Sequence, residues 1–294
     1  MRNFIIGTDW WTDCDDAVAM RIFARAHKRG EIAIKGIIIN ACMECSAASL
    51  DGFLNTENVG GIPIGIDTDA TDFGGRPPYQ KSLAQFAVKY KSNADAEDPV
   101  RLYRRILAEA ESPVEIAEIG FLQVVAALIE SAPDDISELT GEELIKEKVA
   151  RFWVMAGKWD TERGIENNFE RNARSRKGAA VFCAKCPVPI TFLGWEIGAD
   201  VISGDCLQKG DVLHNVLCEH GSPNGRSSWD PMLAVLALTG DCEKAEYDAV
   251  CGTASVDPQT GENSFCASPN GQHCYVVRKR DTDFYKNAIN SLIL

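Results

Sequence analysis

The sequence predicts an α/β fold in which a mostly parallel, mixed sheet is flanked by helices on both faces. Short apolar runs alternate along the chain with segments of helical periodicity, which is the order expected of βα units. The chain has 294 residues, of which 45% are hydrophobic and 25% are charged, enough to bury a core without added cross-links. No internal repeat and no long linker divides it, so we expect a single domain over residues 1–294.

Seven apolar runs are expected to form strands, and the segments between them to form helices. The first run, FIIG, is typical of a buried strand, and the helix expected after it has Ala17, Met20, Ile22 and Phe23 for a buried face. The expected strands cover residues 4–7, 34–39, 62–66, 114–119, 152–155, 190–193 and 247–251. The expected helices cover residues 15–27, 47–55, 100–111, 122–130, 174–184 and 231–238. Residues 132–148 are expected to form a charged surface excursion, and residues 252–272 a long loop or a hairpin excursion.

The charge of the chain narrows the classes of partner. With 30 Lys and Arg against 43 Asp and Glu, the formal net charge is −13 at pH 7. Such a field repels phosphate backbones, so general nucleic-acid binding is disfavoured. It also leaves carboxylates free to hold a hard cation such as Ca²⁺ or Mg²⁺.

Neither a membrane span nor an export signal is expected. No apolar segment reaches the roughly 18–20 residues that a span needs, and the N-terminal segment becomes acidic before an apolar signal region forms. The eleven cysteines are therefore expected to be mostly reduced, buried residues of a cytoplasmic protein. The two CxxC pairs, Cys42/Cys45 and Cys183/Cys186, could bind zinc only if they met. One pair follows a strand and the other precedes one, so we expect them at opposite edges of the sheet.

An acidic cluster follows the first expected strand, where an open parallel sheet binds its ligands. Asp9, Asp13, Asp15 and Asp16 stand within eight residues at the start of a helix. They could be a solvated acidic helix N-terminus. Alternatively, a bound Ca²⁺ or Mg²⁺ relieves their repulsion, and one of them activates a water molecule.

Three other expected strand ends carry matching features. Residues 116–122 form a strand-to-helix turn whose glycine frees a backbone carbonyl, and residues 157–169, GKWDTERGIENNF, supply acids and amides suited to hydroxyl groups. Asp230 stands directly before an apolar helix, with Pro231 at a plausible first helical position.

With these four motifs in this order, the chain resembles the nucleoside hydrolase family. GTDWWTDCDDAVA is similar to the family's opening, a strand followed by Asp-x-Asp, a short turn and Asp-Asp-Ala-x-Ala. Here the first Asp of that motif is Gly7, the turn is longer and its glycine is Trp11. IGFL at 119–122 resembles the family's Thr-Gly-Pro-Leu turn, ENNF at 166–169 its Glu-x-Asn element, and WDP at 229–231 its late calcium motif.

The resemblance implies a Rossmann-like fold and a Ca²⁺-dependent enzyme that cleaves the N-glycosidic bond of ribonucleosides. It implies a homodimer or homotetramer, and roles in nucleoside catabolism and purine salvage. The implied calcium ligands are Asp9, Asp16, Asp230 and the carbonyl of Ile119. The implied general base is Asp15, which takes a proton from the attacking water, and the implied sugar-binding residues are Glu166, Asn168 and Asp160.

The base-binding side departs from the family pattern. Many members carry a His before the last calcium Asp, suited to protonating the leaving base, whereas this chain has Trp229. An indole cannot donate that proton but can stack on a purine, so we expect Trp229 to bind the base and purines to be preferred. Trp229 could equally be packed beside the metal site. Trp10, Trp11 and Trp195 are further candidate walls, and none of the four histidines is expected to be catalytic.

Two other functions stay open. The altered turn and the missing His leave room for a non-catalytic protein that binds nucleosides or sugars on the same fold. A metal-dependent phosphohydrolase would need a second acid two residues after Asp9, where this chain has Trp11. Asn40 and Glu196, which follow two other expected strands, are weaker candidates for the pocket.

Overall fold

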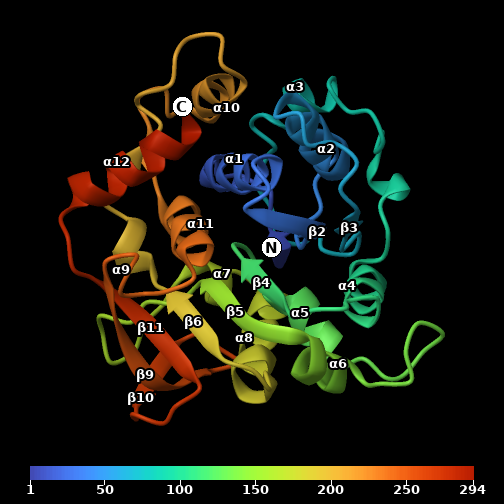
Figure 1. Ribbon diagram of the computed structural model, residues 1–294, viewed down its shortest axis with the longest axis vertical. Coiled ribbons are helices and arrows are strands. Elements are labelled where there is room, and N and C mark those ends of the chain that lie inside the picture. The colour runs from blue at the N-terminus through green and yellow to red at the C-terminus, as the bar shows by residue number, and fades with distance from the viewer.

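A nine-stranded sheet runs through the molecule, which the computed structural model describes over residues 1–294 (Figure 1). Its strands stand in the order β10-β9-β11-β6-β5-β4-β1-β2-β3. They are β1 (Arg2–Thr8), β2 (Ile32–Ile39), β3 (Ile64–Ile66), β4 (Val114–Glu118), β5 (Val149–Met155), β6 (Ile190–Leu193), β9 (Tyr247–Val256), β10 (Asn263–Ala267) and β11 (His273–Arg278). The neighbours from β3 to β11 are parallel, whereas β9 pairs antiparallel with both β11 and β10. The predicted mostly parallel, mixed sheet is confirmed.

Helices cover both faces of this sheet. They are α1 (Asp15–Lys28), α2 (Ser46–Thr56), α3 (Gln80–Ala84), α4 (Pro99–Ala108), α5 (Gln123–Ile129), α6 (Gly141–Lys148), α7 (Asn167–Glu170), α8 (Ala173–Lys185), α9 (Trp195–Gly198), α10 (Val212–His220), α11 (Trp229–Thr239) and α12 (Thr282–Ile293), with a 3-10 turn at Asn93–Asp95. No helix combines the length and the apolar character that a membrane span requires.

The alternation of side chains along β1 explains the two layers. Phe4 and Ile6 point into a core shared with α1, α2, α11 and α12, whereas Ile5 points into a second core shared with α4, α5, α6 and α8. Helices α1 and α11 pack side by side (Figure 1). The predicted buried face of α1 is confirmed, because Ala17, Met20, Ile22 and Phe23 are all fully buried in the first core.

The strand order places a switch point between β1 and β4. The chain builds outward from β1 through β2 to β3, then returns to β4 and builds in the other direction through β5 and β6. Loops that leave β1 and β4 therefore diverge to opposite sides and open a crevice at the carboxyl ends of these strands. The acidic segment after β1 and the turn after β4 meet there.

The structure adds several elements to the sequence prediction. For residues 252–272 the hairpin alternative is confirmed, because β9 extends to Val256 and β10 pairs with it. Strand β11 and helices α10 and α12 were not expected, and α6 forms the end of the predicted surface excursion. Strands β9 to β11 lie at the edge of the sheet with many exposed side chains, so their sequence lacks the continuous apolar runs of the central strands. A two-stranded sheet, β7 (Ile202–Ser203) with β8 (Arg226–Ser227), was also missed.

The cysteines match the sequence expectation in part: nine of the eleven are free, but one disulfide forms and few of the free ones are buried. Cys251 and Cys274, which face each other in the register of β9 and β11, form a disulfide. Of the nine free cysteines only Cys14, Cys183 and Cys186 are buried. Cysteines therefore serve less often as small core residues than expected. The two CxxC pairs stand apart along the fold, one after β2 and the other at the end of α8 before β6.

Gly7 on β1 faces Glu118 on β4, and the two share one space. They are register partners in the parallel pair, and a Cβ on Gly7 would lie 1.7 Å from Glu118 Oε2. The Glu118 carboxyl is buried, accepts a hydrogen bond from the Tyr103 hydroxyl, and has its pKa raised to about 8 by burial. The chain thus has a buried carboxyl on β4 at the point where the family motif has one on β1.

We predict that Gly7→Ala lowers the free energy of unfolding by about 1–3 kcal/mol, because the added methyl overlaps the Glu118 carboxyl. In a Glu118→Ala background the same change should cost less than about 0.5 kcal/mol, since the overlap is gone. Urea unfolding of the wild type, the two single variants and the double variant measures the coupling free energy between positions 7 and 118. An equal cost of Gly7→Ala in both backgrounds would contradict the shared space.

Candidate functional site

A cavity of about 390 Å³ opens at the carboxyl ends of β1, β4 and β5. Its lining comes from the turn after β1, the first turns of α1 and α11, and the helices α7 and α9. Eight of the nine residues singled out by the sequence line it, namely Asp9, Asp15, Asp16, Ile119, Glu166, Asn168, Trp229 and Asp230. Segments more than 200 residues apart in sequence therefore meet at one cavity.

Carboxylates form the floor of this cavity. Asp15, Asp16 and Asp230 are buried, and each offers an oxygen within 4.8 Å of the other two. Asp15 and Asp16 stand in the first turn of α1 and Asp230 in the first turn of α11, so two helix N-termini meet at the acids. Asp9, directly after β1, is also buried and contacts Asp16. The structure therefore groups Asp15, rather than Asp9, with Asp16 and Asp230.

No basic side chain forms an ion pair with these four acids, although the charge of Arg226 partly stabilises ionised Asp15. Burial, followed by the neighbouring acids, holds the pKa values of Asp9, Asp15 and Asp230 well above their usual range. The pKa of Asp16 is raised to about 6, again mainly by burial, although the Thr8 hydroxyl donates a hydrogen bond to it. Four buried acids without an ion-pair partner are the arrangement that a divalent cation would stabilise.

The carbonyl of Ile119 supports the same interpretation. Ile119 follows β4, is buried and lines the cavity, and its amide donates to Gly7 O at 2.8 Å. Its carbonyl oxygen accepts no hydrogen bond from any group of the chain. Buried carbonyls are nearly always paired, so this oxygen is free to bind a cation. The oxygen donors of the floor thus fit Ca²⁺ or Mg²⁺.

Local contacts explain how the longer turn after β1 still presents its acids. Trp10 has a positive φ of 43°, an unusual conformation for a large residue, and its fully buried ring donates to Ser49 Oγ at 2.7 Å. The Trp10 amide in turn lies 3.3 Å from Asp16 Oδ1. Trp10 is therefore a core residue that shapes the turn and not a wall of the cavity.

A second wall carries the residues suited to sugar hydroxyls. Glu166 accepts hydrogen bonds from the amides of Asn168 and Gly157, at 2.8 and 2.9 Å, and burial raises its pKa to about 7. The Asn168 amide group donates to Met155 O at 2.9 Å, which leaves its side-chain oxygen facing no donor of the chain. Asp160 does not line the cavity: it is half-exposed and forms an ion pair with Lys158.

Two tryptophans, from the first turns of α9 and α11, form another part of the lining. Trp229 and Trp195 stack with ring centroids 6.4 Å apart, and the Trp229 indole N–H donates to Trp195 O at 2.7 Å. The Arg226 guanidinium lies 5.3 Å from the Trp229 ring centroid. Trp11 lines the rim. Two of the three further candidate walls, Trp11 and Trp195, therefore reach the cavity.

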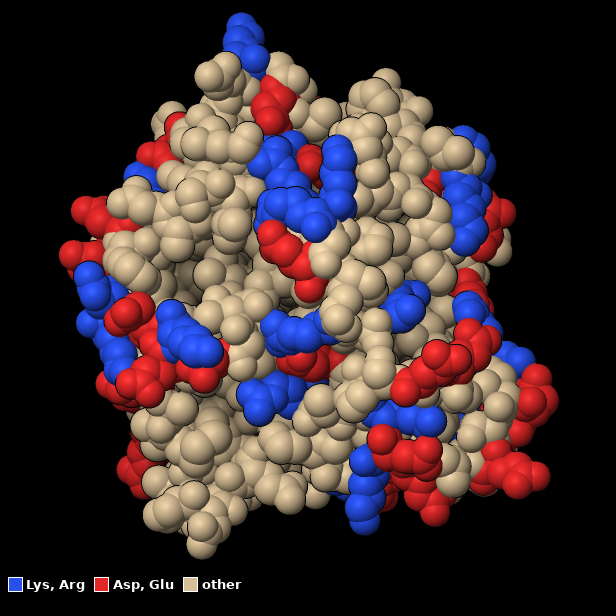
Figure 2. All heavy atoms as spheres, viewed as in Figure 1, with Lys and Arg blue, Asp and Glu red and all other residues tan.

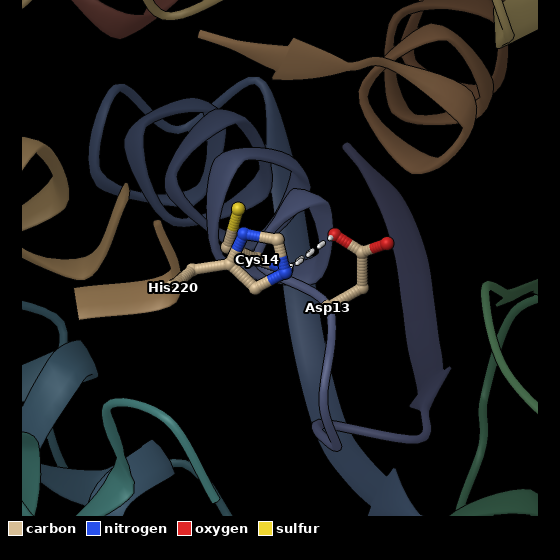
Figure 3. A group of neighbouring side chains, drawn as sticks. All are labelled: Asp13, Cys14 and His220. Atoms are coloured by element: carbon tan, nitrogen blue, oxygen red, sulfur yellow. Dashed lines mark hydrogen bonds and ion pairs between the residues drawn. The ribbon is translucent and has the colours of Figure 1, made fainter. Parts of the chain in front are cut away.

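Asp13, Cys14 and His220 form a second cluster beside the cavity (Figure 3). Asp13 pairs with Arg226 through two hydrogen bonds of 2.8 and 2.6 Å, and His220 Nε2 lies 3.6 Å from Asp13 Oδ1. Burial and the neighbouring acids raise the pKa of the Cys14 thiol, so it is not a thiolate ligand. Because Arg226 already neutralises Asp13, this cluster fits a cation poorly.

Some residues near the site were missed or misjudged from the sequence. The cavity is also lined by Asn167, Arg171 and Arg226. The two arginines were missed because the sequence does not show which acid, if any, an arginine will pair with. Asn40 and Glu196 lie outside the lining. Asn40 instead accepts a hydrogen bond from the Phe121 amide at 3.0 Å and so supports the turn after β4. None of the histidines lines the cavity.

No model of a protein family and no curated protein matches the chain. Solved structures do. One is the inosine–uridine preferring nucleoside hydrolase from Bacillus anthracis, with 13% identity, a TM-score of 0.67 and coverage of 100% of this chain and 99% of that one. Another is the purine-preferring ribonucleoside hydrolase from Gardnerella vaginalis, with 15% identity, a TM-score of 0.67 and coverage of 99% and 98%.

A third similar structure is the type III effector protein XopQ complexed with adenosine diphosphate ribose, with 12% identity, a TM-score of 0.67 and coverage of 99% and 93%. At these identities the similarity concerns the fold. The resemblance that the sequence motifs indicate is confirmed at that level: the chain has the nucleoside hydrolase fold.

Proposed function

We propose that the protein hydrolyses the N-glycosidic bond of ribonucleosides with the help of a divalent cation, calcium being the cation that the sequence resemblance implies. The observation that carries the proposal is the trio of buried carboxylates, each with an oxygen within 4.8 Å of the others, in a cavity also lined by Ile119 with its unpaired carbonyl. Residues suited to sugar hydroxyls and stacked indoles line the same cavity. The nucleoside hydrolases with this fold support the choice of reaction.

Asp16, Asp230 and the Ile119 carbonyl would hold the cation, with Asp9 or Asp15 as the further carboxylate. When bound, the cation offsets the charge of the acids and lowers the pKa of a water molecule beside it. These residues are hard oxygen donors, the type that calcium prefers.

The general base would be whichever of Asp9 and Asp15 does not bind the cation. We propose Asp15, whose Oδ2 accepts the Asp230 amide at 3.2 Å and is thereby oriented at the floor. The grouping of Asp15 with Asp16 and Asp230 also permits the exchanged assignment, in which Asp15 binds the cation and Asp9 is the base. In either case an unprotonated carboxylate takes a proton from the attacking water.

The walls of the cavity would hold the two halves of the substrate. Glu166 and the free oxygen of Asn168 can accept hydrogen bonds from the sugar hydroxyls and so orient the ring. Bond cleavage develops positive charge on the sugar, which the surrounding carboxylates stabilise. Trp229, with Trp195 stacked on it, offers a broad face for the base.

Calcium should raise the melting temperature of the purified protein, because it binds only the folded arrangement of acids. EDTA should lower it and abolish release of free base from inosine. Asp230→Asn should lose most of the calcium response, whereas Asp248→Asn, at an exposed carboxylate on β9, should keep it. Unchanged melting and unchanged activity in EDTA would remove the cation from the proposal.

Asp15→Asn should lower kcat for inosine by about 10²–10⁴-fold, because the amide cannot accept the proton. Its calcium affinity, measured by isothermal titration calorimetry, should fall far less than that of Asp16→Asn. Asp9→Asn is the matched comparison. If calcium affinity falls in Asp15→Asn while Asp9→Asn loses only turnover, then Asp15 binds the cation and Asp9 is the base. Near wild-type turnover in Asp15→Asn would exclude Asp15 as the base.

Trp229→Ala should lower kcat/KM for inosine more than kcat/KM for uridine, because a purine overlaps an indole more completely than a pyrimidine does. One aromatic stack contributes about 0.5–1.5 kcal/mol, or roughly 2- to 13-fold in kcat/KM. Parallel assays of free-base release from both nucleosides measure the ratio. Equal losses would assign Trp229 to packing beside Asp230, and a wild-type preference for uridine would contradict the purine preference.

A further inference from the structure

We propose that the rim of the cavity contains an anion subsite, formed by Arg171 and the Gly74–Gly75 turn, that binds a phosphoryl group on the sugar of the substrate. The inference rests on the proposed function and names its substrate class as nucleoside monophosphates. Four observations carry it: the unpaired charge of Arg171, the free amides of the turn, their position beside the sugar wall, and the charge balance of the rim.

Arg171 has a charge that no acid of the chain neutralises. It lines the cavity, and its Nε and Nη2 both donate to the single carbonyl of Phe73, at 3.1 and 2.8 Å. The guanidinium lies 4.5 Å from the Trp11 ring centroid. Nearby arginines on α8 do have acidic partners: Arg174 pairs with Asp72 and Arg176 with Glu170. Arg171 is thus held in place with Nη1 still free to donate.

The turn next to Arg171 adds unpaired amides. Gly74 and Gly75 have φ angles of +76° and +82°, and neither amide donates to another group of the chain. Gly75 lines the cavity, and a Cβ there would lie 2.4 Å from Thr12 Cγ2. The Gly74 carbonyl is tied back by the Trp11 indole N–H at 2.7 Å. Successive free amides beside a guanidinium suit an oxyanion.

The position of Arg171 indicates that the phosphoryl group is attached to the sugar of the substrate and not to the base. Arg171 follows Asn168 by three residues at the end of α7, so it extends from the helix proposed to bind the sugar, and its guanidinium lies against Trp11 at the rim. The tryptophans proposed for the base, Trp195 and Trp229, come from α9 and α11. A phosphoryl group bound at Arg171 would therefore be carried by the sugar.

The charge balance of the rim fits one phosphoryl group and not a polyanion. Figure 2 shows Lys and Arg beside Asp and Glu near the middle of the face in view, so charges of both signs lie together there. The other arginine of the cavity, Arg226, is neutralised by Asp13. With a net charge of −13 the chain as a whole repels extended phosphate backbones, whereas Arg171 provides local attraction for a single group.

The test compares inosine with inosine 5′-monophosphate in the wild type, in Arg171→Ala and in Lys177→Ala. Lys177 is an exposed cation on α8 outside the cavity, and its removal controls for the general loss of one positive charge. For each protein, free-base release gives kcat/KM, and isothermal titration calorimetry in the presence of Ca²⁺ gives the affinity for each compound.

The wild type should bind the monophosphate more tightly than inosine. Arg171→Ala should lower the ratio of the two affinities, and of the two kcat/KM values, by at least about 10-fold, whereas Lys177→Ala should leave both ratios unchanged. An unchanged ratio in Arg171→Ala would mean that Arg171 only holds the loop at Phe73, and would overturn the subsite. So would a wild-type protein that binds the monophosphate no more tightly than inosine.

The two proposals fail differently. If the wild type releases base from neither compound, the hydrolase assignment fails. The calorimetric ratio then still decides on the subsite, because it needs binding and not turnover. If inosine is hydrolysed but the ratio does not depend on Arg171, the hydrolase stands and the subsite is excluded.

Discussion

The mutual repulsion of buried carboxylates at the switch point of the sheet is the constraint on which the rest of the site depends. Asp15, Asp16 and Asp230 come from the first turns of two helices, and these helices pack against each other over the sheet. Helix N-termini favour negative charge, but they compensate only part of the cost of burying three or four carboxylates. A cation held between them and the Ile119 carbonyl would supply the remainder, so fold stability and catalysis would depend on the same ion.

The cavity separates three kinds of chemistry along its depth. Buried acids and a free carbonyl lie at the floor, residues proposed to bind the sugar and stacked indoles form the walls, and arginines also line the cavity. Several segments contribute: the floor comes from α1, α11 and the turns after β1 and β4, the sugar wall from α7, and the indole wall from the first turns of α9 and α11. Because the parallel strands end at one edge, segments distant in sequence can contribute without long connections.

The sequence predicted the central part of the fold well because buried parallel strands and amphipathic helices have strong periodic signals. The hairpin of β9 and β10 was less visible, since edge strands expose much of their surface. At the site, strand-end positions indicated the segments and the family resemblance implied the residues, and eight of the nine candidates line the cavity. Asp160 was the exception, because an acid in a loop can turn to a nearby lysine, here Lys158. Arg171 was missed because its importance lies in the absence of an acidic partner, which only tertiary structure reveals.

The most direct test of the central claim is a crystal structure of the protein soaked in Mn²⁺ as an anomalous stand-in for Ca²⁺, with an anomalous difference map calculated at the site. The account predicts a peak between Asp16, Asp230 and the Ile119 carbonyl, within coordination distance of Asp9 or Asp15. A map without a peak at the floor, or with the ion instead between Asp13 and His220, would contradict it.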